Sequence, residues 1–459
     1  FDIGFRGNYK KKMSYDANIF LLKYEDRIGF VQRVFQDGNV KSEKGNVGNA
    51  KINGIESLFD FDLSYFEAGT VQFAFFSAYF ALSIPSSYFL TKIGYKRGII
   101  TGLLVMALGC ALFYPAAEYR SFGIFISGYF ILAGGMTLLQ VAINPFVAIL
   151  GDEKSSSSRL TLAQAFHSLG TAIAPAVGAF FILSDTIKTK AQIGDLTHSM
   201  KESYLAAEAA AVQLPFVTIA AVIALVAILF LFAKLPKLIE SSERTSYWDL
   251  LQHKNLLYGV LGIFFYVGAE VAIGSYLVNY LLHMDLVPII KNNVMMKIIA
   301  EGLLNTELVQ LDQKAIVGFF VTFYWSGAMI GRFVGAYLTK QFSPGKVIGI
   351  FAFCAMALGL ISIATVGLTA MWSLIAIGLF NSIMFPTIFS LAIGGLGVLK
   401  PKASGLLCMA IVGGALVPPM FGFLADTSGF NVALLLVVMC YAYIAFFGFR
   451  NYRTKELVL

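Results

Sequence analysis

Long apolar stretches alternate with short polar loops from residue 68 to the end of the chain. A helix that crosses a bilayer needs about 20 mostly apolar residues, and eleven stretches are long enough. They lie at residues 68–90, 98–117, 122–150, 160–183, 213–233, 256–282, 315–338, 346–368, 370–396, 403–424 and 431–449. The pattern therefore predicts an all-α polytopic membrane protein with eleven recognisable spans.

Polar stretches divide this pattern into five parts. The stretch from Lys234 to Lys254 contains Glu240, Glu243 and Asp249, which is typical of a linker between two helical bundles. We expect a polar N-terminal segment, an N-terminal bundle, a cytoplasmic linker, a C-terminal six-helix bundle and a cytoplasmic tail. Their boundaries are 1–66, 67–234, 235–255, 256–450 and 451–459.

The composition agrees with a membrane protein. Hydrophobic residues make up 58% of the chain and charged residues 13%, whereas soluble domains average about 45–50% and about 25%. The 42 Phe and 21 Tyr exclude intrinsic disorder. The net charge of +7 comes mostly from short loops, where basic residues orient a membrane protein. We therefore expect the lipid bilayer, and no nucleic acid, as a partner.

Residues for catalysis or metal binding form no recognisable pattern. The four cysteines lie in apolar stretches and none is spaced as C-x-x-C, so neither a disulfide framework nor a metal site is expected. There is no H-E-x-x-H motif and no phosphate-binding loop. We therefore predict no enzyme, no catalytic residue and no cofactor.

The two halves of the chain repeat each other. Met106-Ala107-Leu108-Gly109 returns as Met356-Ala357-Leu358-Gly359, and Gly170 and Pro175 match Gly413 and Pro418. Parallel repeats are one architecture of secondary transporters, with the substrate site near the midplane between the halves. The N-terminal half has five spans where the C-terminal half has six. No stretch of residues 1–58 could supply the missing one.

Several segments together resemble one family of carriers. They are Phe61-Asp62-Leu63-Ser64-Tyr65, Ile93-Gly94-Tyr95-Lys96-Arg97-Gly98, the stretches 139–146 and 159–170, Tyr266-Val267-Gly268-Ala269-Glu270, Gly331-Arg332-Phe333 and the stretch 385–391. The set resembles the major facilitator superfamily, within it the fucose–proton symporter family and its glucose/galactose transporter branch. The resemblance implies two six-helix bundles, alternating access and coupling to an ion gradient. It also implies a carboxylate on a first helix, which is missing here, and another at the position of Gln140, which cannot titrate.

Glu270 is the most informative polar residue inside a predicted span. A charged side chain at the bilayer centre costs about 2.5–3.5 kcal/mol, so Glu270 must be protonated, paired or in contact with a wet cavity. Tyr266, four residues earlier, shares its helical face. We predict that both residues bind substrate and that Glu270 also couples an ion. The alternative is a buried acid that bonds to a neighbouring helix.

Two further spans carry amides at helical spacing. Gln140 and Asn144 are four residues apart, and Gln164 and His167 are three apart, so each pair shares one face. Amides donate and accept hydrogen bonds, which suits the hydroxyls of a hexose. We predict that all four contact substrate; the alternative is a set of polar contacts between helices.

Asn381 and Phe385 are also four residues apart and offer an amide beside an aromatic ring, so we predict that both contact substrate. Packing is the alternative for these two residues. We predict that Lys92, Lys96, Arg97 and Lys340 gate access from the cytoplasmic side, where basic residues also set topology. Basic residues concentrate on this side when the linker and the C-terminus are placed in the cytoplasm.

These observations predict a monomeric secondary active transporter in the cytoplasmic (inner) membrane. It would import a hexose, glucose- or galactose-like or else fucose or mannose, by alternating access coupled to a proton or sodium gradient. The monosaccharide and the coupling ion are its expected partners. An uncoupled sugar facilitator, a transporter-like sensor and a non-functional truncated carrier are the alternatives.

Overall fold

The protein is described here from a computed structural model. It covers residues 2–9, 13–24, 28–34, 40–46, 50–61, 73–119, 121–182, 200, 203–204, 211–236, 247–304, 307–308, 311 and 313–456. The chain forms two compact units, Phe1–Ser64 and Tyr65–Leu459. Each unit is described by itself.

The first unit contains β-strands, where the sequence predicted only a polar segment. Strands β1 (Asp2–Tyr9), β2 (Met13–Tyr24) and β5 (Ala50–Phe61) form an antiparallel sheet in the order β1-β2-β5. Strands β3 (Ile28–Val34) and β4 (Val40–Asn46) pair with each other, also antiparallel. Polar and apolar residues mix at short range in these segments, as in Ser14-Tyr15-Asp16-Ala17-Asn18-Ile19, and such a mixture suits strands better than a membrane helix.

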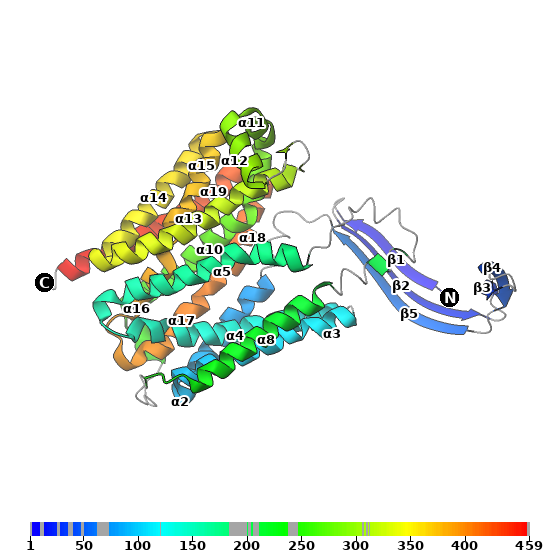
Figure 1. Ribbon diagram of the computed structural model, residues 1–459, viewed down its shortest axis with the longest axis horizontal. Helices are drawn as coiled ribbons and strands as arrows, with labels where there is room; N and C mark the ends of the chain where they lie inside the picture. The colour runs from blue at the N-terminus through cyan, green and yellow to red at the C-terminus, as the bar shows by residue number, and fades with distance from the viewer. Residues whose placement is uncertain are drawn as a thin grey trace. The chain divides into compact units, whose positions relative to one another are not determined.

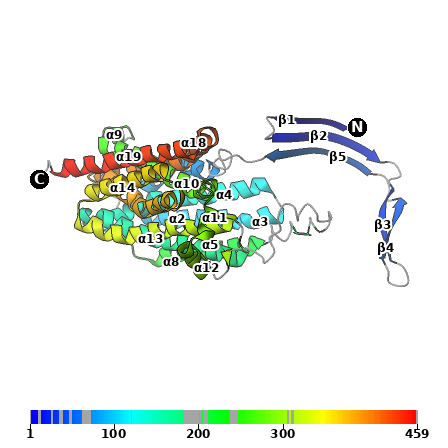
Figure 2. The same cartoon turned by 90° about the horizontal axis from the view of Figure 1, so that it is seen from above.

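The described residues of the second unit are helical, which confirms the predicted all-α membrane fold for this part of the chain (Figures 1 and 2). Its helices include α2 (Phe73–Ala111), α3 (Phe113–Glu118), α4 (Phe122–Ile149), α5 (Ser156–Ile182), α8 (Gln213–Phe232), α9 (Tyr247–Leu251), α10 (Lys254–His283), α11 (Leu286–Asn292), α12 (Val294–Leu304), α13 (Gln313–Gln341), α14 (Pro344–Ala364), α15 (Gly367–Asn381), α16 (Met384–Ile393), α17 (Lys400–Met409), η4 (Ala410–Val412), α18 (Gly413–Ser428) and α19 (Phe430–Glu456).

Nine helices among the described residues are long and apolar enough to cross a membrane, against eleven predicted spans. The first of them, Phe75–Glu118, runs for 44 residues, far more than the roughly 20 that one crossing needs. Its backbone breaks at Gly94, where φ is 80° and the helical conformation is lost. It therefore covers the first two predicted spans. Helix α5, 27 residues long, occupies the fourth predicted span but is not one of the nine.

The helices pack as two groups. In the first group, α2 contacts both α4 and α8, and α4 also contacts α5; α10 and α13 to α19 form the second group (Figure 1). The groups meet mainly where α5 lies against α13 and α16, and where α2 lies against α17. The break at Gly94, the start of α5 and the end of α13 share one end of the unit, which we call the inner end. The basic residues predicted to be cytoplasmic cluster there.

Glycines allow some of these helices to touch backbone to backbone. A Cβ atom at Gly331 of α13 would lie 2.3 Å from the Leu379 carbonyl oxygen of α15. A Cβ atom at Gly378 of α15 would lie 2.2 Å from the Tyr324 carbonyl oxygen of α13. Small residues permit such close approach in membrane bundles, where packing replaces the hydrophobic effect as the driving force. The α13–α15 contact therefore depends on glycine.

We predict that Gly331→Ala lowers the thermal unfolding temperature of the detergent-solubilised protein, because the added methyl group forces α13 and α15 apart. Overpacking of this kind costs about 1–3 kcal/mol. Gly318→Ala on the same helix is the matched control, since a Cβ atom there meets nothing within 4 Å. Equal unfolding temperatures for the two variants would contradict the close packing of α13 on α15.

Candidate functional site

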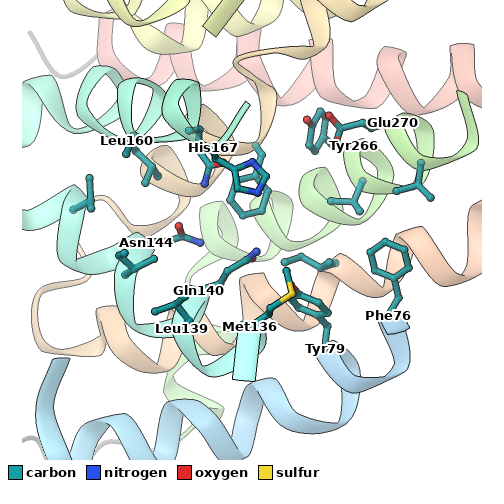
Figure 3. Close-up of a pocket in the computed structure, with 18 of the residues that line it drawn as sticks. Phe76, Tyr79, Met136, Leu139, Gln140, Asn144, Leu160, His167, Tyr266 and Glu270 are labelled. Carbon is teal, nitrogen blue, oxygen red and sulfur yellow. The ribbon is translucent and has the colours of Figure 1, made fainter. Parts of the chain in front are cut away.

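A cavity of about 580 Å³ lies between the two helix groups (Figure 3). Helices α2, α4 and α5 supply one wall, and α10, α13, α16 and η4 supply the other. Seven of the eight predicted substrate contacts line it, namely Gln140, Asn144, Gln164, His167, Tyr266, Glu270 and Phe385. The structure therefore brings residues together that lie up to 245 positions apart in the sequence, from 140 to 385.

The first wall carries amide and imidazole side chains among apolar residues, and none of its described residues is Asp, Glu, Lys or Arg. Gln140 and Asn144 come from one face of α4, and Gln164 and His167 come from α5. Figure 3 shows the Gln140 and Asn144 amides pointing toward the space that the His167 ring also faces. Asn144 is only 2% exposed, and its Nδ2 has no hydrogen-bond partner among the described residues. A buried donor without a partner is costly, so this amide is suited to a ligand or a water molecule.

The second wall carries the charges. Glu270 and Tyr266 lie four residues apart on α10, and Arg332 lies opposite them on α13. The Arg332 Nη2 is 3.9 Å from the Glu270 Oε1, and both side chains are largely shielded, at 11% and 17% exposure. The Tyr266 side chain is buried, and its hydroxyl lies within hydrogen-bonding reach of the Glu270 carboxylate on the same helix. Phe385 of α16 adds an aromatic ring 6.5 Å from the Tyr266 ring.

Arg332 also joins the two helix groups. Its Nε donates to the Ser382 carbonyl oxygen at 3.1 Å within the second group. Its Nη1 donates to the Gln164 carbonyl oxygen at 3.3 Å and to the Ser168 hydroxyl, both on α5. The guanidinium has five N–H donors in a fixed fork, and here they reach a carboxylate and two helices at once. Arg332 is therefore the contact through which Glu270 is linked to α5.

The sequence analysis named Arg332 only within the segment Gly331-Arg332-Phe333 and gave it no role in the site. The structure places Arg332 nine residues before the end of α13, where it lines the cavity. A signal was present: an intramembrane acid such as Glu270 needs a partner, and Arg332 is a base inside the helix of a predicted span. The sequence could not show which helices face each other.

Asn381 is the one predicted substrate contact that does not line the cavity. It lies at the end of α15, fully buried, and its Nδ2 donates to the Tyr324 hydroxyl at 2.6 Å. The four-residue spacing from Phe385 failed as a guide because the helix does not continue between them: α15 ends at Asn381 and α16 begins at Met384.

The predicted gating residues lie at the inner end, away from the cavity. Lys92, Lys96 and Arg97 flank the break at Gly94 and line a separate groove with Lys234. The Lys96 Nζ donates to the Leu231 carbonyl oxygen of α8 at 2.8 Å. Lys340 lies in the last turn of α13. These contacts stay within the first helix group or at its edge, and a gating role for these residues stays a prediction.

The two helix groups are bonded to each other at the inner end. The pairs are the Ser157 and Ser390 hydroxyls at 2.5 Å, the Ser158 hydroxyl donating to the Ala336 carbonyl at 2.6 Å, and Lys400 with Glu153 at 3.8 Å. Farther in, at the depth of the cavity, the Ser404 hydroxyl donates to the Val141 carbonyl at 2.9 Å. Helix α5 begins at Ser156, so the first two pairs lie between the cavity and the inner end. The inner end is therefore closed.

Comparison with known proteins agrees with this architecture. The Major Facilitator Superfamily matches residues 52–398 of the chain. A protein of Brucella abortus named glucose/galactose transporter is 44% identical over 394 residues, covering 84% of this chain and 86% of its own length. The chain belongs to the major facilitator superfamily. Within it, the chain belongs to the fucose–proton symporter family and its glucose/galactose transporter branch.

Two further relatives of this family are similar to the chain. The L-fucose-proton symporter of Escherichia coli is 36% identical over 409 residues, and the alignment covers 86% of each of the two chains. A crystal structure of FucP in the outward conformation matches with a TM-score of 0.72 and 34% identity, over 85% of this chain and 91% of that one. The predicted fold and family are thus confirmed.

The chemistry of the cavity favours a polar, uncharged ligand. Amides, a phenol and a histidine offer both donors and acceptors, while Glu270 and Arg332 largely neutralise each other. Within the described residues, no group of three or more His, Cys, Asp and Glu side chains is placed to hold a metal ion.

We predict that Arg332→Met destabilises the protein more than the double variant Arg332→Met with Glu270→Gln. Removing one partner of a buried pair leaves an uncompensated charge, which costs about 3–5 kcal/mol, and the second substitution removes that charge. Thermal unfolding in detergent measures the difference. A double variant no more stable than Arg332→Met alone would contradict the pairing.

Proposed function

We propose that this protein imports a hexose, glucose- or galactose-like, by secondary active transport coupled to protons. The observation that carries the proposal is the cavity between the two helix groups, with neutral amides on one wall and a shielded acid–base pair on the other. The named relatives, a glucose/galactose transporter and an L-fucose-proton symporter, support the same substrate class.

The polar groups of the cavity suit a sugar. Each sugar hydroxyl donates one hydrogen bond and accepts others, and Gln140, Asn144 and Gln164 can do both. The Asn144 Nδ2 is buried and lacks a partner among the described residues, so a bound sugar would satisfy it. The rings of Tyr266 and Phe385 offer an apolar surface for the C–H groups of a pyranose. A volume of about 580 Å³ lies within the usual range for small-molecule sites.

Glu270 is the residue that we assign to ion coupling. It is the acid that lines the cavity, and Gln140 on the opposite wall cannot titrate. Arg332 lies 3.9 Å away and repels a second cation that approaches the carboxylate. The same charge opposes a proton, but a proton bonds to a single carboxylate oxygen, neutralises Glu270 and releases Arg332, whereas a sodium ion needs several oxygen ligands around it. The arrangement therefore favours protons over sodium as the coupling ion.

Release of Arg332 connects protonation to movement of the helices. While Glu270 is charged, it holds Arg332 in a position from which the guanidinium also bonds α5. Once Glu270 is neutral, the contact between α13 and α5 loses one of its supports. We infer that this loosens the closed inner end and permits alternation between the two faces of the membrane.

The closed inner end identifies the state of the carrier. With that end in the cytoplasm of the cell and the inner membrane as its location, the protein would face outward, ready to accept external sugar. Similarity to FucP in the outward conformation supports this assignment. We expect the carrier to act as a monomer, since the cavity is completed within one chain.

An uncoupled sugar facilitator is the second candidate. It is favoured by Gln140, which leaves Glu270 as the single acid among the described residues of the cavity walls, and by the pairing of Glu270 with Arg332. If Glu270 stays ionised throughout the cycle, no proton is carried. Coupling therefore depends on Glu270 alone, and one substitution separates the two candidates.

We predict that Glu270→Gln abolishes proton-driven accumulation of labelled glucose or galactose in proteoliposomes and retains exchange of labelled for unlabelled sugar. Glutamine keeps the size and hydrogen-bonding capacity of the residue but cannot release a proton. Uptake is compared with an inward proton gradient, an inward sodium gradient and no gradient. Proton-driven accumulation that survives Glu270→Gln would contradict the assignment of ion coupling to Glu270. Equal uptake by the unaltered protein in all three conditions would favour the facilitator.

We also predict that Asn144→Ala weakens sugar binding about tenfold, since it removes one or two hydrogen bonds worth about 1 kcal/mol each. Ser127→Ala is the control, because the Ser127 hydroxyl bonds the Gly123 carbonyl of its own helix, α4, and does not line the cavity. Isothermal titration of the purified protein measures both. An unchanged dissociation constant for Asn144→Ala would remove Asn144 from the binding site.

A further inference from the structure

A second, smaller chamber adjoins the cavity. Its volume is about 240 Å³, and it shares His167, Glu270 and Arg332 with the main cavity. Thr171, Trp325 and Ala328 line this chamber and do not line the main cavity. The Glu270–Arg332 pair therefore stands between two spaces and borders both.

The smaller chamber lies on the outer side of the charged pair. Helix α13 runs toward the inner end, and Trp325 precedes Arg332 by seven residues, which is about 10 Å along a helix axis. Helix α5 runs the opposite way, and Thr171 follows His167 by four residues. On both helices, the residues that line only this chamber therefore lie farther from the inner end than the residues that it shares with the main cavity. We call it the outer chamber.

Trp325 lies close to helix α10 because position 274 of that helix is a glycine. A Cβ atom at Gly274 of α10 would lie 3.0 Å from the Trp325 Cζ2. Gly274 follows Glu270 by four residues, so the two share one helical face. The Tyr324 ring meets the indole edge-on at 5.1 Å. The absence of a side chain at position 274 thus lets the indole lie close to the helix that carries the acid.

We propose that the outer chamber is a second sugar subsite, in which the apolar face of a pyranose ring packs on Trp325 before the sugar passes the Glu270–Arg332 pair. This inference rests on the proposed sugar transport. Aromatic side chains combine a large apolar surface with defined geometry, and Thr171 and His167 line the same chamber and can bond the sugar hydroxyls. The chamber is small: at about 30 Å³ per water molecule in the liquid, it has room for about eight waters, which a sugar ring would displace.

Two subsites in series explain the position of the charged pair. A sugar in the outer chamber touches Glu270 and Arg332 from the outer side, and a sugar in the main cavity touches them from the other. Binding in the outer chamber then selects pyranoses before the pair rearranges, and the amides of the main cavity select among them afterwards.

The three tryptophans of the chain allow a direct test. The double variant Trp248→Phe with Trp372→Phe leaves Trp325 as the only tryptophan. The matched control, Trp248→Phe with Trp325→Phe, leaves Trp372, which packs against Phe320 and Phe323 and lines neither space. D-glucose and D-galactose are titrated into both purified proteins while the tryptophan fluorescence is recorded. Mannitol, an acyclic polyol, controls for non-specific effects.

The proposal expects a saturable fluorescence change with the hexoses in the Trp325 protein, none with mannitol, and none in the Trp372 protein. The change should persist with a similar midpoint after Asn144→Ala, because Asn144 lies in the main cavity. It also expects Trp325→Leu to raise the KM for uptake about fivefold to tenfold with kcat within twofold.

A Trp325 protein that transports hexose but shows no fluorescence change would overturn the outer subsite and leave the proposed function intact. A midpoint that shifts as strongly as transport affinity after Asn144→Ala would also overturn it, since a single site would then explain both signals. Absence of both hexose binding and hexose uptake in the unaltered protein would instead overturn the proposed function, and with it this inference.

Discussion

The ion pair between Glu270 and Arg332 is the interaction on which the rest of this bundle depends. Neither charge is stable alone in an apolar environment, because the desolvation of an ion costs several kcal/mol even after relaxation. Here each charge has the other, and the guanidinium has further acceptors on α15–α16 and on α5. The pair therefore fixes how closely α5, α10 and α13 approach one another. Any change in the charge of Glu270 alters all of those contacts together.

The two walls of the cavity have different tasks. The wall of α4 and α5 presents neutral donors and acceptors, which can bind hydroxyls without a change in charge. The wall of α10 and α13 holds the charges, and we propose that it responds to protons. Because Arg332 bonds α5 across the cavity, the two tasks are mechanically connected. A carrier needs such a connection if sugar and proton are to move together rather than separately.

Much of this arrangement could be predicted from sequence periodicity. Apolar stretches of membrane length located the helices, and four-residue spacing correctly paired Gln140 with Asn144 and Tyr266 with Glu270, because neighbours on one helix face need no tertiary information. Contacts between helices were harder to predict. The same spacing did not bring Asn381 to the cavity with Phe385, because the helix is interrupted at Ser382-Ile383 between them. The role of Arg332 depends on α13 facing α10 and α5. The strands of residues 2–61 were missed because they lack the long periodic pattern of the helices.

The central claim is that the cavity serves a carrier whose inner end must open for transport. The Ser157 and Ser390 hydroxyls are 2.5 Å apart across that end, so Ser157→Cys with Ser390→Cys, in a chain whose four native cysteines are replaced, places two thiols within reach of a disulfide. Oxidation should abolish hexose uptake into proteoliposomes, leave hexose binding from the outer side intact, and be reversed by a reducing agent. Either single variant should be insensitive to oxidation. Full uptake by the cross-linked protein would contradict the account.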